Sequence, residues 1–564
     1  MKIAGNDILI QSLINEGVEY IFGYPGGAAL HIYDSIFNQK EMQHILVRHE
    51  QGATHAADGY ARATGKPGVV LVTSGPGATN AITGIATAFM DSIPMVIISG
   101  QVQSHLIGTD AFQETDMIGV SRPIVKHSFT VDKQENIANI VAEAFHIATS
   151  GRQGPVLIDV PKDLTNPDDL FDFVYPDKVH VRSYNPPIKP ENHQVSRAVD
   201  AILASERPVI YAGGGTISSN ASKELRELND LIDAPVTNTL MGLGVFPGTH
   251  KRFLGMLGMH GTYQANMAMH NADLIIALGA RFDDRITNAP DKFAPRAKVI
   301  HFDVDHSSVS KIIEADIAVF GQIKDSLQAI NNHLKTKIDE IDNEKLAPWH
   351  QQISDWKEKH GLNHDLYKIE DDSGPILPQA AVQHIYQESQ GKAFVTSDVG
   401  QHQMFAAQYY HFDEPRKWIN SGGLGTMGFG LPSAMGVKLA YPDEEVICIT
   451  GEGSIQMCIQ ELSTCSQYKL PIKIFNMNNL ALGMVKQWQD MNYDGRHSSI
   501  SYEDSLPDFV GLAESYGHVG IKITKNSELK KGIAKALSIK DRLVFVDIYV
   551  DPDEHVYPMQ VANG

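Results

Sequence analysis

The sequence predicts an α/β protein made of three doubly wound parallel-sheet domains. Short runs of Val, Ile and Leu recur along the chain and alternate with helix-like stretches. These runs are continuously apolar, which is typical of strands buried on both faces of a parallel sheet. The length of 564 residues fits this prediction, because domains typically hold roughly 100 to 200 residues.

Composition excludes several classes of protein. Hydrophobic residues make up 43% and charged residues 20% of the chain, which is close to the globular average and excludes a mainly disordered protein. The formal net charge is −20 and the basic residues are scattered, so we expect no nucleic-acid partner. The three cysteines lack the paired spacing of a zinc site. Three cysteines are also too few for a disulfide scaffold in a chain of this length.

The N-terminal segment predicts a domain-opening helix rather than a signal peptide, because Ile10, Leu13, Ile14 and Val18 recur on one helical face. Apolar runs elsewhere are far shorter than the roughly 20 residues that span a bilayer, so we expect no membrane span. Together these observations predict a cytoplasmic protein.

The first domain is predicted over residues 1–165. Between Ile45 and Gly100 the pattern reads βαβαβ, with apolar strands at Val69–Val72 and Met95–Ile98 and a turn at Ser74–Gly77. Residues 166–193 carry five prolines and no apolar periodicity, which indicates a linker.

Two further α/β domains follow. The second, residues 194–345, contains the predicted strands Pro208–Tyr211, Leu274–Leu278 and Val299–Phe302. A loose polar linker is expected over 346–378. The third domain, 379–550, contains the predicted strands Ala393–Thr396, Val446–Thr450, Ile472–Phe475 and Leu543–Val546, and a tail is expected over 551–564. The first and third domains have a similar strand-and-helix rhythm.

The most specific motif is Gly451-Glu-Gly-Ser454, which follows one predicted strand, while Asn478 and Asn479 follow the next. Ligands bind beyond the carboxyl ends of parallel strands. A carboxylate and an amide oxygen suit a hard cation that bridges a diphosphate, and Gly453 lets the backbone approach a phosphate. The alternative is a pair of ordinary strand-to-helix turns.

This motif resembles the signature of the thiamine-diphosphate enzymes, Gly-Asp-Gly followed about two dozen residues later by Asn-Asn. The resemblance implies thiamine diphosphate and Mg²⁺, with Glu452, Asn479 and the backbone carbonyl of Ala481 as metal ligands. Position 452 departs from the family, since it carries Glu in place of Asp. Mg²⁺ demands near-ideal geometry at about 2.1 Å, so the longer side chain predicts weaker metal and cofactor binding.

By the same resemblance, Glu50 is the catalytic glutamate that favours the imino form of the cofactor's aminopyrimidine. Its alternative is an ion pair with Arg48 or His49 on a surface turn. Met427 matches the residue that supports the bent cofactor, and its alternative is core filling. The other implied cofactor contacts are Tyr24, Pro25, Gly26, Pro76, Asn80, Gln113, Val399, Gly400, Gln401, His402, Gly425, Gly453, Ser454, Gly483 and Met484.

Several longer stretches narrow the resemblance to the bacterial, biosynthetic acetohydroxyacid synthase (acetolactate synthase) large subunits. They are Tyr24–Ala28, Ala111–Asp116, Met256–Gly261, Gly279–Arg285 and Gly483–Gln489. The resemblance covers essentially the whole chain. It implies that pyruvate is decarboxylated on the cofactor and that the resulting hydroxyethyl carbanion attacks a second 2-keto acid, pyruvate or 2-ketobutyrate, in branched-chain amino acid biosynthesis.

The residues implied for the substrates are Gly27, Ala28, Phe112, Lys162, Arg285, Met484 and Trp488. Arg285 offers a forked, permanently charged partner for a carboxylate, and its alternative is a surface ion pair with Asp283 or Asp284. Trp488 offers an apolar wall that would favour the extra methyl group of 2-ketobutyrate by about 1 to 3 kcal/mol, and its alternative is core packing.

The second domain carries Gly213, Gly214 and Gly215 after a strand, yet the G-x-G-x-x-G spacing fails because position 218 is Ser. The residues alone therefore leave a dinucleotide site undecided. The resemblance implies a structural FAD, because the overall reaction transfers no net electrons. The implied FAD contacts are Arg152, Gly213, Gly214, Gly215, Met259, His260, Gly279, Arg281 and Asp303. Gln322 departs from the Asp that is frequent in relatives.

The family geometry implies a homodimer with active sites at the subunit interface, and a small regulatory subunit as a further partner. Two other functions stay open. One is a pyruvate oxidase or decarboxylase, which would need no site for a second keto acid. The other is a weakened homologue that serves as an assembly subunit, an alternative motivated by Glu452 and by Cys458, where relatives usually have Asn.

Overall fold

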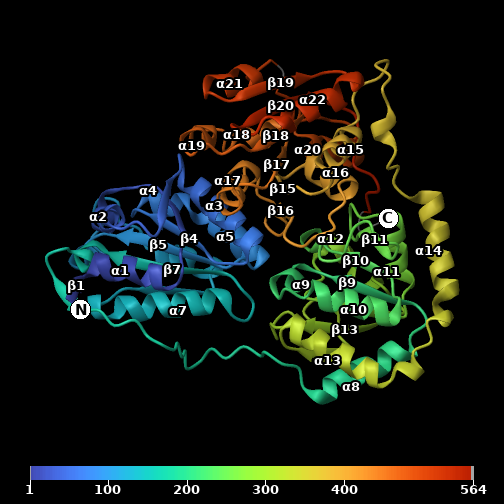
Figure 1. Ribbon diagram of the computed structural model, residues 1–564, viewed down its shortest axis with the longest axis horizontal. Coiled ribbons are helices and arrows are strands. Elements are labelled where there is room, and N and C mark those ends of the chain that lie inside the picture. The colour runs from blue at the N-terminus through green and yellow to red at the C-terminus, as the bar shows by residue number, and fades with distance from the viewer. Residues whose placement is uncertain (1, 503, 561–564) are drawn as a thin grey trace.

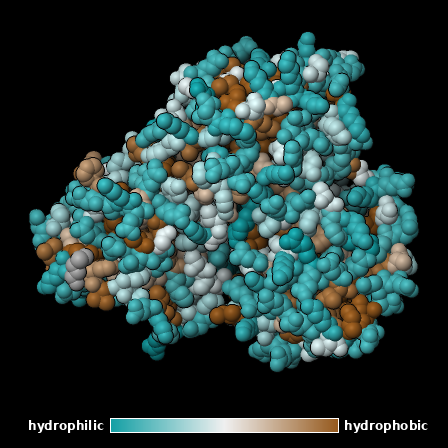
Figure 2. Space-filling view, viewed as in Figure 1, coloured by the Kyte–Doolittle hydropathy of each residue, from teal (hydrophilic) through white to brown (hydrophobic). Residues whose placement is uncertain are grey.

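The computed structural model describes residues 2–502 and 504–560. It contains three parallel six-stranded sheets, each flanked by helices, and this confirms the predicted fold class (Figure 1). We call these sheets with their helices the first, second and third units, in chain order. Within residues 2–502 and 504–560 no helix is both long and apolar enough to cross a membrane. The face drawn in Figure 2 carries mostly hydrophilic residues with scattered hydrophobic ones.

The first unit has the strand order β3-β2-β4-β5-β7-β6. Its central strands β4, β5 and β7 are buried along their whole length, as their continuous apolar runs predict. The strands are β2 (Tyr20–Gly23), β3 (Gln43–Leu46), β4 (Gly68–Val72), β5 (Met95–Gln101), β6 (His127–Thr130) and β7 (Pro155–Pro161). The main helices are α1 (Gly5–Asn15), α2 (Leu30–Asn38), α3 (Glu50–Thr64), α4 (Pro76–Asn80), α5 (Ile82–Asp91) and α7 (Ile137–Thr149).

The second unit has the strand order β11-β10-β9-β12-β13-β14. The strands are β9 (Pro208–Ala212), β10 (Val236–Asn238), β11 (Phe253–Met256), β12 (Leu274–Leu278), β13 (Lys298–Asp303) and β14 (Ile317–Phe320). The main helices are α8 (Asn192–Ala204), α9 (Gly214–Ser218), α10 (Ser222–Ile232), α11 (Tyr263–Asn271) and α13 (Ile323–Thr336). A separate apolar core of Val, Ile and Leu side chains fills the space between this sheet and its helices.

The third unit has the strand order β16-β15-β17-β18-β20-β19. The strands are β15 (Phe394–Ser397), β16 (Trp418–Asn420), β17 (Val446–Thr450), β18 (Lys473–Asn478), β19 (Val519–Ile523) and β20 (Val544–Tyr549). The main helices are α15 (Pro378–Ser389), α16 (Gln401–Tyr409), α17 (Gly430–Ala440), α18 (Glu452–Gln456), α19 (Glu461–Gln467), α20 (Gly483–Asn492), α21 (Phe509–Ser515) and α22 (Asn526–Ser538).

The two predicted linkers hold more structure than expected. In the first, β8 (Leu170–Asp172) pairs antiparallel with β1 (Lys2–Ala4). In the second, residues Ala347–His360 form the helix α14, so the expectation of a loose segment there is wrong. Trp349 and Ile353 recur at helical spacing and are buried against the second unit, and a short apolar stripe of this kind is easily missed among polar residues.

The first and third units share one continuous core, in which α3 crosses α17 (Figure 1). The two backbones approach so closely that a Cβ atom on Gly436 would lie 1.9 Å from the carbonyl oxygen of Ala56. A Cβ atom on Gly59 would lie 2.2 Å from the carbonyl oxygen of Ser433. Only glycine fits at these two positions, and the crossing therefore fixes the first unit against the third.

We expect Gly436→Ala to lower the free energy of unfolding by about 1 to 3 kcal/mol, because the added methyl group forces the helices apart. Helix propensity alone predicts the opposite sign, a gain of about 1 kcal/mol. Urea unfolding measures the difference. Gly374→Ala is the matched control, since apart from its two chain neighbours no described residue lies within 4 Å of its Cβ position. Equal stability of the two variants would contradict the close crossing.

Candidate functional site

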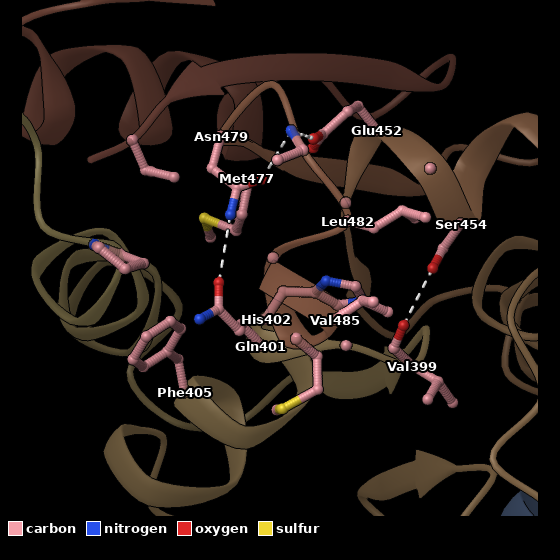
Figure 3. Close-up of a pocket in the computed structure, with 18 of the residues that line it drawn as sticks. Val399, Gln401, His402, Phe405, Glu452, Ser454, Met477, Asn479, Leu482 and Val485 are labelled. Atoms are coloured by element: carbon pink, nitrogen blue, oxygen red, sulfur yellow. Dashed lines mark hydrogen bonds between the residues drawn. The ribbon is translucent and has the colours of Figure 1, made fainter. Parts of the chain in front are cut away.

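A pocket lies at the carboxyl end of the third sheet, where the turns after β15, β17 and β18 meet (Figure 3). This is the edge at which parallel sheets bind ligands. Many of the residues predicted for the diphosphate and the metal line it. Its lining includes Val399, Gly400, Gln401, His402, Met427, Glu452, Gly453, Ser454, Asn479, Ala481, Gly483 and Met484.

The three predicted metal ligands lie together in this pocket. The Ala481 amide donates a hydrogen bond to Glu452 Oε1 over 2.7 Å and lies 3.3 Å from Asn479 Oδ1. A carboxylate, an amide oxygen and a backbone carbonyl are hard oxygen donors of the kind that Mg²⁺ prefers. Burial raises the pKa of the Glu452 carboxyl to about 7, although backbone amides partly offset that rise.

Around the predicted metal ligands, polar side chains from three turns are joined by hydrogen bonds (Figure 3). Asn479 Nδ2 donates to Gln401 Oε1 over 3.2 Å, and Ser454 Oγ donates to the carbonyl oxygen of Val399 over 3.1 Å. His402 is buried, and this lowers its pKa to about 3 and keeps the ring neutral. Its Nε2 atom has no hydrogen-bond partner among the described residues, so the pocket offers an unsatisfied polar atom to a ligand.

Asp398, which was not among the residues predicted from the sequence, holds the loop beyond Met427. Its carboxylate accepts hydrogen bonds from the Gly430 amide over 2.9 Å and from Thr450 Oγ1 over 2.7 Å. The side chain is fully buried, and this desolvation raises its pKa while the amide bonds lower it. An Asp directly after a buried strand and just before the predicted Val399–His402 contacts was the available signal.

Glu50 is the first residue of α3 and is buried at the carboxyl end of the first sheet. Asn80 Nδ2 donates to Glu50 Oε2 over 2.9 Å. Arg48 instead bonds to Ser463 Oγ at 3.0 Å and Gln467 Oε1 at 2.7 Å. The structure therefore brings Glu50 together with the predicted Asn80, and it does not support the surface ion pair with Arg48.

Other predicted residues of the first unit gather at the same sheet edge as Glu50. The Ala28 amide donates to Thr73 Oγ1 over 3.3 Å, which joins the turn after β2 to the turn after β4. A Cβ atom on Gly75 would lie 2.8 Å from the carbonyl oxygen of Gln113. Phe112 is 87% exposed. Of the residues that line the third-unit pocket, none comes from this group, so one chain does not bring the two halves of the predicted site together.

A second pocket lies over the carboxyl end of the second sheet, between all three units. Six of the predicted FAD contacts line it, namely Arg152, Gly214, Gly215, Gly279, Arg281 and Asp303. Four of its lining side chains carry buried polar atoms without a partner among the described residues, Arg62 Nη1, Tyr211 Oη, Thr239 Oγ1 and Asp283 Oδ1. Unsatisfied buried groups of this kind indicate a polar ligand.

Three of the nine predicted FAD residues, Gly213, Met259 and His260, do not line that pocket. The Met259 amide donates to the carbonyl oxygen of Arg285 over 2.8 Å, and the Gln560 amide donates to the Met259 carbonyl over 2.7 Å. Gln408 Nε2 donates to the carbonyl oxygen of His260 over 2.8 Å. Gln408 Nε2 also donates to the carbonyl oxygen of Tyr557 over 3.2 Å, so Met259 and His260 lie against the C-terminal tail.

The predicted substrate residues are dispersed in the single chain. The Arg285 side chain is 67% exposed and lies 3.8 Å from Asp284, as in the alternative of a surface ion pair. Trp488 is half-buried on α20, and Lys162 is half-buried after β7. Among Arg285, Trp488, Lys162 and Met484, only Met484 lines the third-unit pocket.

The chain is similar to known proteins over its whole length, and three family models match successive segments of it. Residues 3–120 match the family described as "Thiamine pyrophosphate enzyme, N-terminal TPP binding domain", 195–330 match its central domain, and 398–548 match its C-terminal TPP binding domain. The chain is 56% identical to an acetolactate synthase large subunit of Haemophilus influenzae, over 100% of this chain and 97% of that protein.

Two further relatives have the same coverage, 100% of this chain and 97% of their own length. The acetolactate synthase isozyme 3 large subunit of Escherichia coli is 55% identical. The acetolactate synthase large subunit of Buchnera aphidicola subsp. Schlechtendalia chinensis is 59% identical.

We expect the metal-free protein to lose stability as pH rises from about 4.5 to above 7. The pKa of Glu452 is higher in the folded chain, about 7, than its ordinary value of 4.5. Its contribution is therefore complete below pH 4.5 and is lost as pH rises through 7, with a limit of about 3 kcal/mol. In Glu452→Gln, urea unfolding should show a loss of unfolding free energy across this pH range that is smaller by that amount than in the parent protein.

The exposed Glu514 supplies the control for this measurement, as Glu514→Gln should leave the pH dependence unchanged. A Glu452→Gln variant with the pH profile of the parent protein would contradict the assignment of this titration to Glu452.

Proposed function

The chain belongs to the thiamine pyrophosphate enzymes, among the acetolactate synthase large subunits, and from this membership we propose the reaction that it catalyses. It decarboxylates pyruvate and joins the remaining two-carbon unit to a second 2-keto acid, either pyruvate or 2-ketobutyrate. The product is acetolactate or acetohydroxybutyrate. This reaction is the first common step of branched-chain amino acid biosynthesis. The observation that carries this proposal is identity of 55 to 59% to acetolactate synthase large subunits over the full chain.

The third-unit pocket fits thiamine diphosphate and its metal ion. When bound, thiamine diphosphate supplies a nucleophilic carbon and accepts the electron pair that is released as carbon dioxide leaves. Glu452, Asn479 and the carbonyl of Ala481 would hold Mg²⁺, and the fit rests on their hard oxygen donors and on the unpartnered His402 Nε2. Ser454 and the N-terminal amides of α18 would face the diphosphate.

The role that we propose for Glu50 is to hold a proton at the far ring nitrogen of the cofactor's pyrimidine. The Glu50 carboxyl is buried, and Asn80 fixes one of its oxygens. A carboxyl oriented in this way and shielded from water transfers a proton along one direction, which contributes roughly 10²- to 10⁴-fold to a rate. Met427 lines the opposite pocket, where its side chain would support the bent cofactor.

The second pocket would hold FAD. Its lining carries the guanidinium groups of Arg152, Arg281 and Arg416, which suit a diphosphate. Asp303, at the end of β13, is placed for the adenosine half, and Gln322 lines the pocket in spite of its departure from relatives. The flavin would be structural, since joining two keto acids with loss of carbon dioxide transfers no net electrons.

The separation of Glu50 from the third-unit pocket supports a homodimer in which each active site takes one half from each chain. Phe112 and Tyr24 are exposed large apolar side chains of the first unit, as expected for a surface that a second chain covers. Arg285 and Trp488 would contact the second keto acid in that assembly. The relatives are named large subunits, and this supports a small regulatory subunit as a further partner. A cytoplasmic location follows only from the sequence.

We expect the purified protein with pyruvate, Mg²⁺, thiamine diphosphate and FAD to yield acetolactate as its main product. Glu50→Gln should lower the rate by roughly 10²- to 10⁴-fold, because amide nitrogen and oxygen do not relay the proton. Glu41→Gln, an exposed residue of the same unit, is the control. Acetaldehyde or acetate as the main product would move the protein to a decarboxylase or an oxidase.

A mixture of two inactive variants tests the shared active site. In a dimer of one Glu50→Gln chain and one Asn479→Ala chain, one of the two sites has both halves intact. Random mixing should therefore restore about a quarter of the parent activity. Equilibrium refolding of the mixture followed by the acetolactate assay measures it. Absence of any recovery would show that each site is built within one chain.

A further inference from the structure

The three units of the chain meet at one turn, Gly422–Gly423. The turn belongs to the third unit and follows β16. The last residue of α5, Asp91, reaches it from the first unit, while Met241 and Arg281 reach it from the second. Asp91, Met241 and Arg281 also line the second pocket, so this turn borders the proposed flavin site.

Asp91 holds the turn through both carboxylate oxygens. The Gly423 amide donates to Oδ1 over 2.7 Å, and the Gly422 amide donates to Oδ2 over 3.1 Å. Arg62, an α3 residue that also lines the second pocket, donates from Nη2 to Oδ2 over 2.9 Å. The Asp91 side chain is fully buried, so these three donors replace water around its charge.

The turn has little room to move. A Cβ atom on Gly422 would lie 2.4 Å from Met241 Sδ. A Cβ atom on Gly423 would lie 2.9 Å from Asp91 Oδ1 and 3.2 Å from Arg281 Nη2. A shift of Asp91 or Arg281 in the second pocket therefore displaces the backbone of the turn.

The same segment leads into the other pocket. Met427, four residues after the turn, lines the pocket proposed for thiamine diphosphate. Its neighbour Thr426 is held by α5 as well, since its Oγ1 atom lies 2.8 Å from Thr87 Oγ1. The helix α5 thus contacts the loop at two points, at Asp91 beside the second pocket and at Thr87 next to Met427.

We propose that Asp91 is a positioning residue that couples the two pockets, so that FAD in the second pocket tightens the binding of thiamine diphosphate in the third-unit pocket. A flavin packed against Arg62, Asp91 and Arg281 immobilises the Gly422–Gly423 turn and, through it, Met427. Thiamine diphosphate then binds a loop that is already ordered and loses less conformational entropy. The inference rests on the proposed function. Through it, a flavin that transfers no electrons would still aid catalysis, because it tightens the binding of thiamine diphosphate.

The test measures the dissociation constant of thiamine diphosphate, at saturating Mg²⁺, with and without FAD. Isothermal titration calorimetry reports it without turnover. In the parent protein we expect FAD to lower this constant by about 5- to 150-fold, the usual span of such couplings. Asp91→Asn replaces one acceptor oxygen by a donor, so it no longer accepts from both glycine amides. It should reduce the effect of FAD to less than about twofold.

The matched control is Asp159→Asn, a buried aspartate of the same unit that bonds to Gln101 and makes no contact with the turn. It should keep the full coupling. A merely structural role of Asp91 would lower the melting temperature and leave the ratio of the two constants unchanged. If Asp91→Asn does not fold, Thr87→Val replaces it, since it removes the hydroxyl contacts to Thr426 and to the Thr83 carbonyl of its own helix and should weaken the coupling.

Two results would overturn the coupling alone. One is a ratio in Asp91→Asn, or in Thr87→Val where that variant replaces it, equal to that of the parent protein. The other is a parent protein that binds both cofactors independently. A parent protein that binds thiamine diphosphate but no FAD would overturn the proposed flavin site as well, and one that binds neither would overturn the proposed function itself.

Discussion

The crossing of α3 and α17 determines where every other part of the site lies. Because Gly436 packs against the carbonyl of Ala56, the first and third units share one core and cannot pivot on each other. The turn that precedes Glu50 is held by the third unit of its own chain, as the Arg48 amide donates to Glu461 Oε1 over 3.0 Å. That contact places Glu50 against α19 and away from the pocket beside α18. The same packing that stabilises one chain therefore leaves both half-sites open to a second chain.

Three buried carboxylates, Asp91 of the first unit and Asp398 and Glu452 of the third, are stabilised in different ways. Asp91 is paired with Arg62, and Asp398 is surrounded by backbone amides and a hydroxyl. Glu452 accepts a hydrogen bond from Ala481, and no salt bridge reaches it within residues 2–502 and 504–560. A buried carboxylate without a cation is costly when ionised, and a bound divalent metal would remove that cost. Of the three, only Glu452 lines the third-unit pocket, so its charge is the one that an ion bound there would stabilise.

The sequence was sufficient for features that depend on local pattern. Continuous apolar runs located the central strands, and the rule that ligands bind beyond strand ends brought Glu452 and Asn479 together. It was insufficient where partners are remote in the chain. Asp91 and Gly423 are separated by 332 positions, so no local pattern relates them. Helix α14 was missed because only Trp349 and Ile353 are buried in it. The placement of Met259 and His260 depends on the tail and lay equally beyond local inference.

The C-terminal tail joins the third unit to the second. The Val556 amide donates to Gln487 Oε1 and Gln487 Nε2 donates back to the Val556 carbonyl, which ties the tail to α20. Four residues later the Gln560 amide donates to Met259, whose own amide is bonded to the carbonyl of Arg285. The tail residues 556–560 thereby connect the helix that carries Trp488 with the segment that carries Arg285. Arg285 and Trp488, the two residues proposed for the second keto acid, come from different units, and the hydrogen bonds of the tail link their backbones.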